Sequence, residues 1–133
     1  MVDLVTAAEA RTHLRLDTSE DAWLAIFIPA ISEAVLNWLK DEWRAYVPEL
    51  GPDGLPLIDS SGDQVPLLDS NGLMEPKFVV KAAVLVEIAY QFRFREGEGE
   101  GTATGDLYSG RYGYILNKTS TALLQALRKT TVA

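Results

Sequence analysis

The sequence predicts a mainly α-helical fold: a small helical bundle of two long antiparallel helices plus short N- and C-terminal helices, with a β-hairpin-like insert. Two stretches, 18–43 and 76–96, repeat apolar residues at the three-and-four spacing of one helix face. Between them, residues 45–75 are rich in proline and glycine. We expect residues 1–133 to form a single domain, because a chain of this length buries a core without disulfides.

A short helix is predicted at each end of the chain. Thr6 and Glu9 have the spacing of a capping box, which starts a helix that ends near Leu16. Near the other end, Thr119 or Ser120 is expected to cap a last helix. Its leucines would seal the bundle: Leu123, Leu124 and Leu127.

The stretch 18–43 is expected to form the central helix. Thr18 or Ser19 can cap its first turn, and two acids follow where the helix dipole favours negative charge. Pro29 lies inside the apolar pattern, which resumes at Ile31, so we expect a kink and not a break. The apolar face consists of Leu24, Phe27, Ile28, Ile31, Ala34, Val35 and Trp38.

The stretch 76–96 is expected to form the second long helix, antiparallel to the first. Pro76 suits a first helical turn, and small residues later in the stretch permit close approach to the central helix. Glu87 lies within it, and we expect this carboxylate on an exposed strip or in a pair with Lys81, Gln91 or Arg95 nearby. The predicted apolar face consists of Val79, Ala82, Ala83, Val86, Ala89, Tyr90 and Phe94.

The insert contains an internal repeat, PLIDSSG at 56–62 and PLLDSNG at 66–72. Turn signals between short apolar pairs predict a β-hairpin or small meander of edge-type strands. Asp59, Ser61 and Asp63 alternate in the manner of a calcium loop. The glycine and the glutamate that such a loop requires are not in place, which favours turn chemistry over calcium binding.

Residues 96–105, EGEGEGTATG, contain no large apolar side chain to anchor them and are predicted to form a flexible acidic loop. The segment that follows interleaves tyrosine with arginine and glycine, a composition typical of contact surfaces and also able to stack nucleic-acid bases. The formal net charge of −7 favours protein contact. An acidic wall can still line a conduit through which DNA slides.

Chemistry-bearing motifs are scarce. His13 is the only histidine, the chain has no cysteine, and no nucleophile elbow or zinc-protease motif occurs, so we predict a non-enzyme without metal or cofactor. A carboxylate hydrolase that uses Glu87, or Asp41 with Glu42, is the enzymatic alternative. The N-terminus lacks a secretory signal, and no run approaches the ~20 apolar residues of a membrane span, so we expect a soluble cytosolic protein.

Two blocks of the sequence follow a family pattern. The first is matched by Leu4, Thr6, Glu9, Ala10, His13, Leu14, Arg15, Asp17, Glu20, Asp21 and Leu24. The second is matched by Pro76, Val80, Lys81, Ala83, Leu85, Ile88, Ala89, Tyr90, Arg95 and Glu96. With a leucine-bearing terminal helix, these blocks resemble the head-tail connector (adaptor) proteins of long-tailed bacteriophages. The resemblance covers both ends and the long helices, but not the insert.

The resemblance implies a non-enzymatic virion protein at the head-tail junction, assembled in the host cytoplasm. Members of that family form a ring, typically a dodecamer, below the portal protein. The ring extends the channel through which DNA is packaged and ejected, and carries the downstream neck or tail-completion protein. A small regulatory or antitoxin-like protein-binding module is the competing hypothesis, and it would more often form a two-fold dimer.

On this hypothesis, the arginine, lysine and tyrosine residues beside the flexible backbone make the portal and ring contacts. These residues are Tyr108, Arg111, Tyr112, Tyr114, Arg128 and Lys129. The acidic loop faces the lumen or a neighbouring subunit through Glu96, Glu98 and Glu100.

Overall fold

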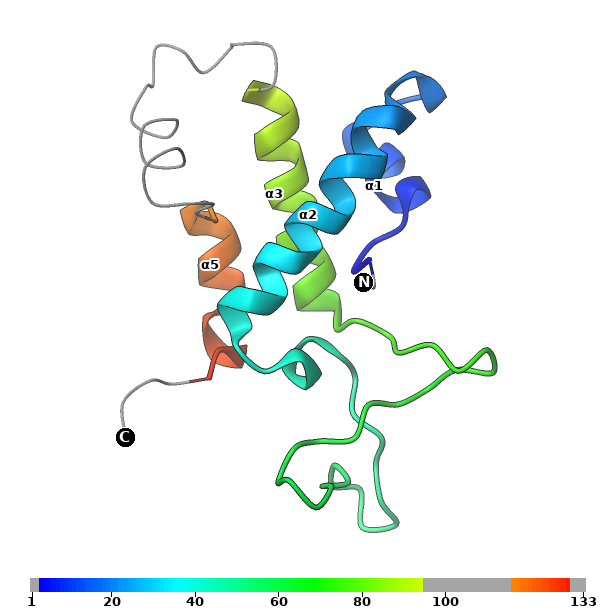
Figure 1. Ribbon diagram of the computed structural model, residues 1–133, viewed down its shortest axis with the longest axis vertical. Coiled ribbons are helices and arrows are strands. Elements are labelled where there is room, and N and C mark those ends of the chain that lie inside the picture. Colours follow the sequence, from blue (N-terminus) through cyan, green and yellow to red (C-terminus); the bar gives the residue numbers. More distant parts are fainter. Residues whose placement is uncertain (1–2, 95–115, 130–133) are drawn as a thin grey trace.

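The computed structural model describes residues 3–94 and 116–129, which are mainly helical, as predicted (Figure 1). The α-helices are α1 (Ala7–Leu14), α2 (Asp21–Leu39), α3 (Phe78–Phe94) and α5 (Lys118–Leu124). Short 3-10 turns lie at Thr18–Glu20, Glu42–Ala45 and Gln125–Leu127.

Helix α1 begins at the predicted capping box. The Glu9 backbone N–H donates to Thr6 Oγ1 at 3.1 Å, and the Thr6 backbone N–H donates to Glu9 Oε1 at 2.9 Å. Arg15 takes a left-handed conformation, with φ of 58°, and ends the helix. The capping prediction is therefore confirmed.

Helix α2 is shorter than predicted but continues through Pro29 without a break. The cap differs from the prediction: Asp17 Oδ1 accepts the Ser19 N–H at 2.8 Å and caps the short turn that precedes the helix. Lys40, with φ of 78°, ends α2. The tryptophan at position 43 thus belongs to a separate 3-10 turn.

Helices α2 and α3 cross obliquely, α1 packs against both, and α5 packs on α3 (Figure 1). Trp23 of α2 stacks on Phe27, with ring centroids 4.4 Å apart, and meets Phe92 of α3 edge-on at 5.3 Å. The Leu4 backbone N–H donates to the buried Ser32 hydroxyl at 3.0 Å and fixes the N-terminal segment to α2. The core unites Leu4, Val5, Ala10, Leu24, Ile28, Ile31, Val35, Leu39, Ala45, Tyr46, Val80, Ala83, Val84, Ile88, Leu116 and Leu124.

The buried face of α3 is rotated relative to the predicted one. It consists of Val80, Ala83, Val84, Glu87 and Ile88. Of the residues placed on the predicted face, Ala82 and Tyr90 are exposed. Apolar residues surround most of this helix, so their spacing alone does not select which side faces the core.

Helix α5 starts two residues earlier than a Thr119 cap would place it and three earlier than a Ser120 cap would. Asn117 is the N-cap, and its Oδ1 accepts the Ser120 N–H at 3.0 Å. Ser120 is instead buried inside the first turn. Leu124 is buried, and Leu123 and Leu127 pack against the core, as the sealing role predicts.

The insert contains no regular strand among the described residues; isolated antiparallel bridges hold it together. Three of these bridges join Tyr46 to Pro76, Pro48 to Pro66, and Leu50 to Pro56. Proline has no N–H to donate, so a ladder cannot continue through these positions. Proline therefore limits ladder growth at three of the five isolated bridges of the insert.

Backbone hydrogen bonds close a cycle inside the insert. The Glu49 N–H donates to Val65 O, the Val65 N–H to Leu57 O, and the Leu57 N–H to Glu49 O, at 2.8, 2.9 and 2.9 Å. Three separate segments of the insert, around Glu49, Leu57 and Val65, are thus tied to one another. The arrangement gives this proline-rich region a defined shape without a sheet.

The predicted turns are present at their expected positions. Asp59 Oδ1 accepts the N–H groups of Ser61 and Asp63, and Asp69 Oδ1 accepts those of Asn71 and Leu73. The Asp59 carboxylate therefore organises a turn, as the sequence favoured.

One described stretch, Thr18–Leu39, is long and apolar enough to span a membrane by length and composition alone. No such stretch was expected from the sequence. The same residues supply Leu24, Ile31 and Val35 to the core, which is also the role of a central helix in a helical domain.

Candidate functional site

Most of the predicted contact residues lie outside the described part of the chain: Tyr108, Arg111, Tyr112, Tyr114, Glu96, Glu98 and Glu100. Arg128 and Lys129 are described, and both follow α5. Two further features, an arm and a groove, emerge from the structure.

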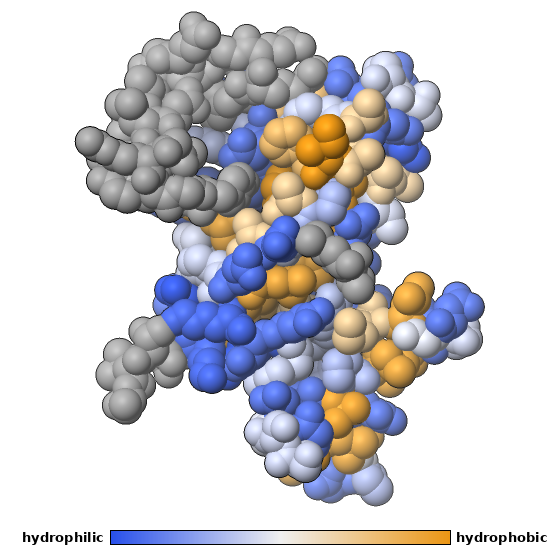
Figure 2. Space-filling view, in the orientation of Figure 1, coloured by the Kyte–Doolittle hydropathy of each residue, from blue (hydrophilic) through white to orange (hydrophobic). Residues whose placement is uncertain are grey.

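The arm, residues 46–76, extends away from the helices (Figure 1). It carries exposed leucine and isoleucine side chains, which are visible at its surface in Figure 2. Their exposed fractions lie between 39% and 63% for Leu50, Leu55, Leu57, Ile58, Leu67, Leu68 and Leu73. Monomeric proteins rarely leave so many large apolar side chains in water on one element, so the arm is a candidate contact surface.

The base of the arm is anchored in the core. Tyr46 is buried, and Lys77 donates its backbone N–H to Ala45 O at 2.9 Å. Burial, with the nearby Glu42 carboxylate, raises the pKa of the Tyr46 hydroxyl. Burial, with the Arg44 guanidinium, lowers the pKa of Lys77. Both shifts reflect how closely the base of the arm packs against the body.

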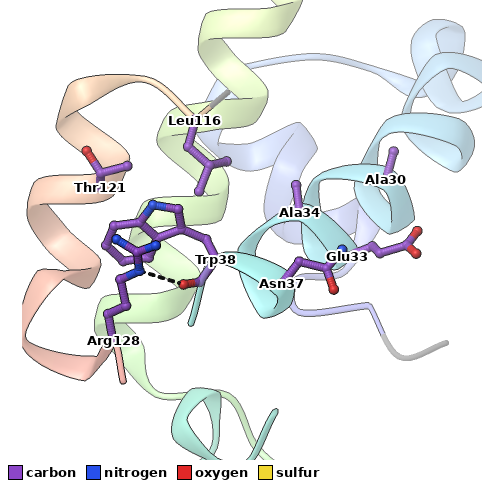
Figure 3. Close-up of a pocket in the computed structure, with 8 residues that line it drawn as sticks. All are labelled: Ala30, Glu33, Ala34, Asn37, Trp38, Leu116, Thr121 and Arg128. Atoms are coloured by element: carbon purple, nitrogen blue, oxygen red, sulfur yellow. Dashed lines mark hydrogen bonds between the residues drawn. The ribbon is translucent and has the colours of Figure 1, made fainter. Parts of the chain in front are cut away.

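The groove lies between α2 and α5 and has a volume of about 610 Å³ (Figure 3). Its residues from α2 are Ala30, Glu33, Ala34, Asn37 and Trp38. Leu116, Thr121 and Arg128 complete the lining. Ala34 leaves space beside the Trp38 ring and Ala30 lies farther along α2, so the groove offers a partly apolar surface with polar edges.

Arg128 is held against Trp38 at one end of the groove. Its guanidinium carbon lies 4.5 Å from the centre of the Trp38 ring, and its Nε donates to Trp38 O at 3.0 Å (Figure 3). The predicted contact residue is therefore positioned by cation–π and hydrogen-bond interactions, with its charge next to an apolar surface.

A basic cluster continues from this end of the groove. Arg44 Nε lies 3.0 Å from Asp41 Oδ2, and Lys129 Nζ lies 3.8 Å from the same oxygen. Arg44 Nη1 also donates to Leu127 O. Figure 2 shows this end of α2 and α5 as a hydrophilic band. Asp41, half of the carboxylate pair considered for catalysis, serves here as the anion of an ion-pair cluster.

The prediction for Glu87 was wrong in its location. This side chain is fully buried, and its Oε2 accepts from the Asn117 backbone N–H at 3.0 Å, from Asn117 Nδ2, and from the Ser120 hydroxyl at 3.0 Å. Gln91 Nε2 lies 3.4 Å from the other carboxylate oxygen, as one of the expected partners. Glu87 thus joins α3 to the start of α5. Asn117 and Ser120 lie 30 and 33 positions along the chain, so neighbouring sequence gave no signal for these two partners.

Within the described ranges, the remaining polar side chains do not gather into a site that could bind a metal ion. His13 is exposed. In residues 3–94 and 116–129, no three histidine, cysteine, aspartate or glutamate side chains lie close enough to hold a metal ion.

The arm was signalled in the sequence by its repeat, but the outward direction of its leucines was not. The groove had no sequence signal, because it is made by residues from two distant helices. Neither a protein-family model, nor a curated protein, nor a solved structure matches this chain.

Proposed function

We propose that this chain is a structural virion neck protein of a tailed bacteriophage. It forms an oligomeric ring below the portal protein, extends the DNA channel and joins the head to the tail. The proposed ring subunit is a bundle of two long antiparallel helices and short terminal helices, with the hairpin-like insert projecting from it. The role is mechanical, and no cofactor is needed for it.

The observation that carries an assembly function is the exposed apolar arm. Burying its leucines against another protein would contribute roughly 25 cal/mol for each Å² of apolar surface removed from water. A protein that worked alone would gain nothing from keeping them exposed. An assembly subunit uses such a surface when it meets its partner.

The resemblance to head-tail connectors is the reason for proposing this particular assembly. Its two sequence blocks pack together in one folded unit, where Glu9 from the first block pairs with Lys81 from the second at 3.2 Å. Buried members of both blocks include Leu4, Leu24, Val80 and Ile88. The matching residues therefore act as packing, capping and ion-pair positions of this fold and not as a set of reactive groups.

Within this proposal, Arg128 and Lys129 contact the portal or a neighbouring subunit, together with the tyrosines and arginine of 108–114. The acidic residues Glu96, Glu98 and Glu100 face the lumen, where negative charge allows DNA to pass without being held.

Native mass spectrometry across a concentration series, with negative-stain imaging, tests the proposal. The sample is the full chain, alone and with purified portal protein from the same virus. We expect closed rings of about a dozen chains, as the resemblance implies, in at least one of the two samples. A two-fold dimer that ignores the portal would contradict the connector function and favour the regulatory module.

A further inference from the structure

The arm has a distinctive charge pattern as well as an apolar surface. Residues 46–76 contain six acids and no lysine or arginine. The acids are Glu49, Asp53, Asp59, Asp63, Asp69 and Glu75. A partner for this arm should therefore combine an apolar recess with positive charge.

The groove between α2 and α5 has both properties. Its volume of about 610 Å³ falls in the range that accommodates several side chains of a bound group. Ala34 leaves room next to the Trp38 ring, Ala30 extends the lining farther along α2, and Leu116 adds an aliphatic wall (Figure 3). Leucine side chains of the arm suit such a lining.

All charged residues on the α5 side of the groove are basic, and Arg128 is the one that lines it. Residues 116–129 contain three cations, Lys118, Arg128 and Lys129, and no acid. Lys118 precedes the lining residue Thr121 by three positions, which places both on one side of α5. The acid in the lining is Glu33 on α2, which points away from Arg128 (Figure 3).

We propose that the arm of one copy binds in the α2–α5 groove of a second copy. This inference rests on the proposed ring function and names the contact that builds the ring. The arm of a given chain is fixed at its base by the bridge between Tyr46 and Pro76 and extends away from the helices (Figure 1). The occupant of the groove therefore comes from the neighbour.

The contact joins two different surfaces, so it is head-to-tail. Each copy offers one arm and one groove, and a repeated contact of this kind closes into a ring when its rotation allows. A symmetric arm-to-arm contact would instead stop at a dimer and would bring like charges together.

Cysteine crosslinking tests this contact directly, because the natural chain has no cysteine. One set of chains carries Leu68→Cys or Leu55→Cys on the arm, and another carries Ala30→Cys in the groove. Mixed sets are treated with a short bis-maleimide in the assembled state. We expect a crosslinked pair that contains one arm variant and one groove variant, identified by peptide mass spectrometry. Ala8→Cys, an exposed alanine on α1, is the matched control and should give at least tenfold less product.

Three outcomes would overturn the proposal. They are rings without arm-to-groove crosslinks, crosslinks between two arms only, and arm crosslinks that form only with a different neck protein. Rings with no arm-to-groove product would remove this contact and leave the connector function standing. Absence of rings with and without portal would instead count against the connector function.

A charge swap provides a second test that does not alter the apolar surface. Glu49→Lys with Glu75→Lys reverses two exposed arm charges, and Lys118→Glu with Lys129→Glu reverses two exposed charges in and just after α5, beside the groove lining. We expect each pair alone to weaken assembly at least tenfold, and the combination of both in one chain to restore it. Equal loss in the combined variant would contradict the pairing of these surfaces. Circular dichroism checks that each variant remains folded.

Discussion

Glu9 on α1 and Lys81 on α3 form an ion pair, with Lys81 Nζ 3.2 Å from Glu9 Oε2, across 72 positions of sequence. The other carboxylate oxygen of Glu9 accepts the Thr6 N–H and completes the capping box. One side chain therefore starts the first helix and fastens it to the third.

Replacing Glu9 with glutamine should lower the free energy of unfolding by about 1 kcal/mol, because the cap weakens and the ion pair is lost. Lys81→Met removes only the partly exposed ion pair and should cost about 0.5 kcal/mol. Urea denaturation followed by circular dichroism measures both. Equal losses in the two variants would show that the cap contributes nothing beyond the pair.

The same residue predicts a pH dependence. The Thr6 backbone N–H is the main cause that lowers the pKa of Glu9 below its ordinary value of 4.5; Lys81 also lowers it, and partial burial opposes both. Because this pKa is lower in the folded chain, Glu9 stabilises the fold above pH 4.5, and the contribution is lost as the pH falls through the folded-state pKa. The stability difference between the natural chain and Glu9→Gln should therefore shrink between neutral pH and pH 3. A difference independent of pH would refute this assignment.

Local signals in the sequence predicted local structure well. The Thr6 cap and the turns at Asp59 and Asp69 depend on side chains that bond to backbone a few residues away, so their spacing is sufficient. The side of α3 that faces the core depends on which neighbours cover it. Apolar residues surround that helix, and the buried stripe through Val84 and Glu87 could not be chosen from spacing.

Tertiary pairing was the part that the sequence did not reveal. Glu87 is stabilised by Asn117 and Ser120, which lie 30 and 33 positions away. The groove similarly needs Trp38 and Arg128, 90 positions apart. The prediction of contact residues in 108–114 stays a prediction, because those residues lie outside the described ranges.

Glu87 should be the most sensitive polar position in the core. Replacing it with leucine removes the acceptor of the Asn117 N–H and leaves the buried Ser120 hydroxyl with only the Ala83 carbonyl oxygen, and should cost about 3 kcal/mol. Glu87→Gln keeps one oxygen acceptor and should cost about 1 kcal/mol. Chemical denaturation of both variants checks the order. A leucine variant as stable as the glutamine variant would mean that these hydrogen bonds make no net contribution.

Substitutions at Gly72 should destabilise its turn through backbone conformation and not through steric clash. Its φ is +77°, and a Cβ added there would meet no heavy atom within 4 Å. Gly72→Ala should therefore destabilise the turn by about 1 kcal/mol, whereas Gly72→Asn should cost less, because asparagine tolerates left-handed backbone. Hydrogen exchange at the amides of Asn71 and Leu73 measures the local effect. Slower exchange in the alanine variant than in the asparagine variant would contradict this account.

Removing the Tyr46 hydroxyl should increase the stability of the fold. Its hydroxyl is buried and has no hydrogen-bond partner among the described residues, and burial raises its pKa above the ordinary value of 10. Tyr46→Phe keeps the ring in the core and removes the unpaired hydroxyl, so the free energy of unfolding should rise by about 1 kcal/mol at neutral pH.

The pH dependence at Tyr46 has the opposite direction to that of Glu9. The pKa of Tyr46 is raised in the folded state, so folding favours the neutral phenol over the ionised form. The stability that comes from this preference is fully present below the unfolded-state pKa and is lost as the pH rises through the folded-state pKa. The natural chain should therefore lose stability above pH 10 relative to Tyr46→Phe, and parallel urea titrations at pH 7 and pH 10.5 measure the change. A phenylalanine variant that is less stable at both pH values would show that the hydroxyl is paired in solution. The base of the arm would then be held by a polar contact as well as by packing.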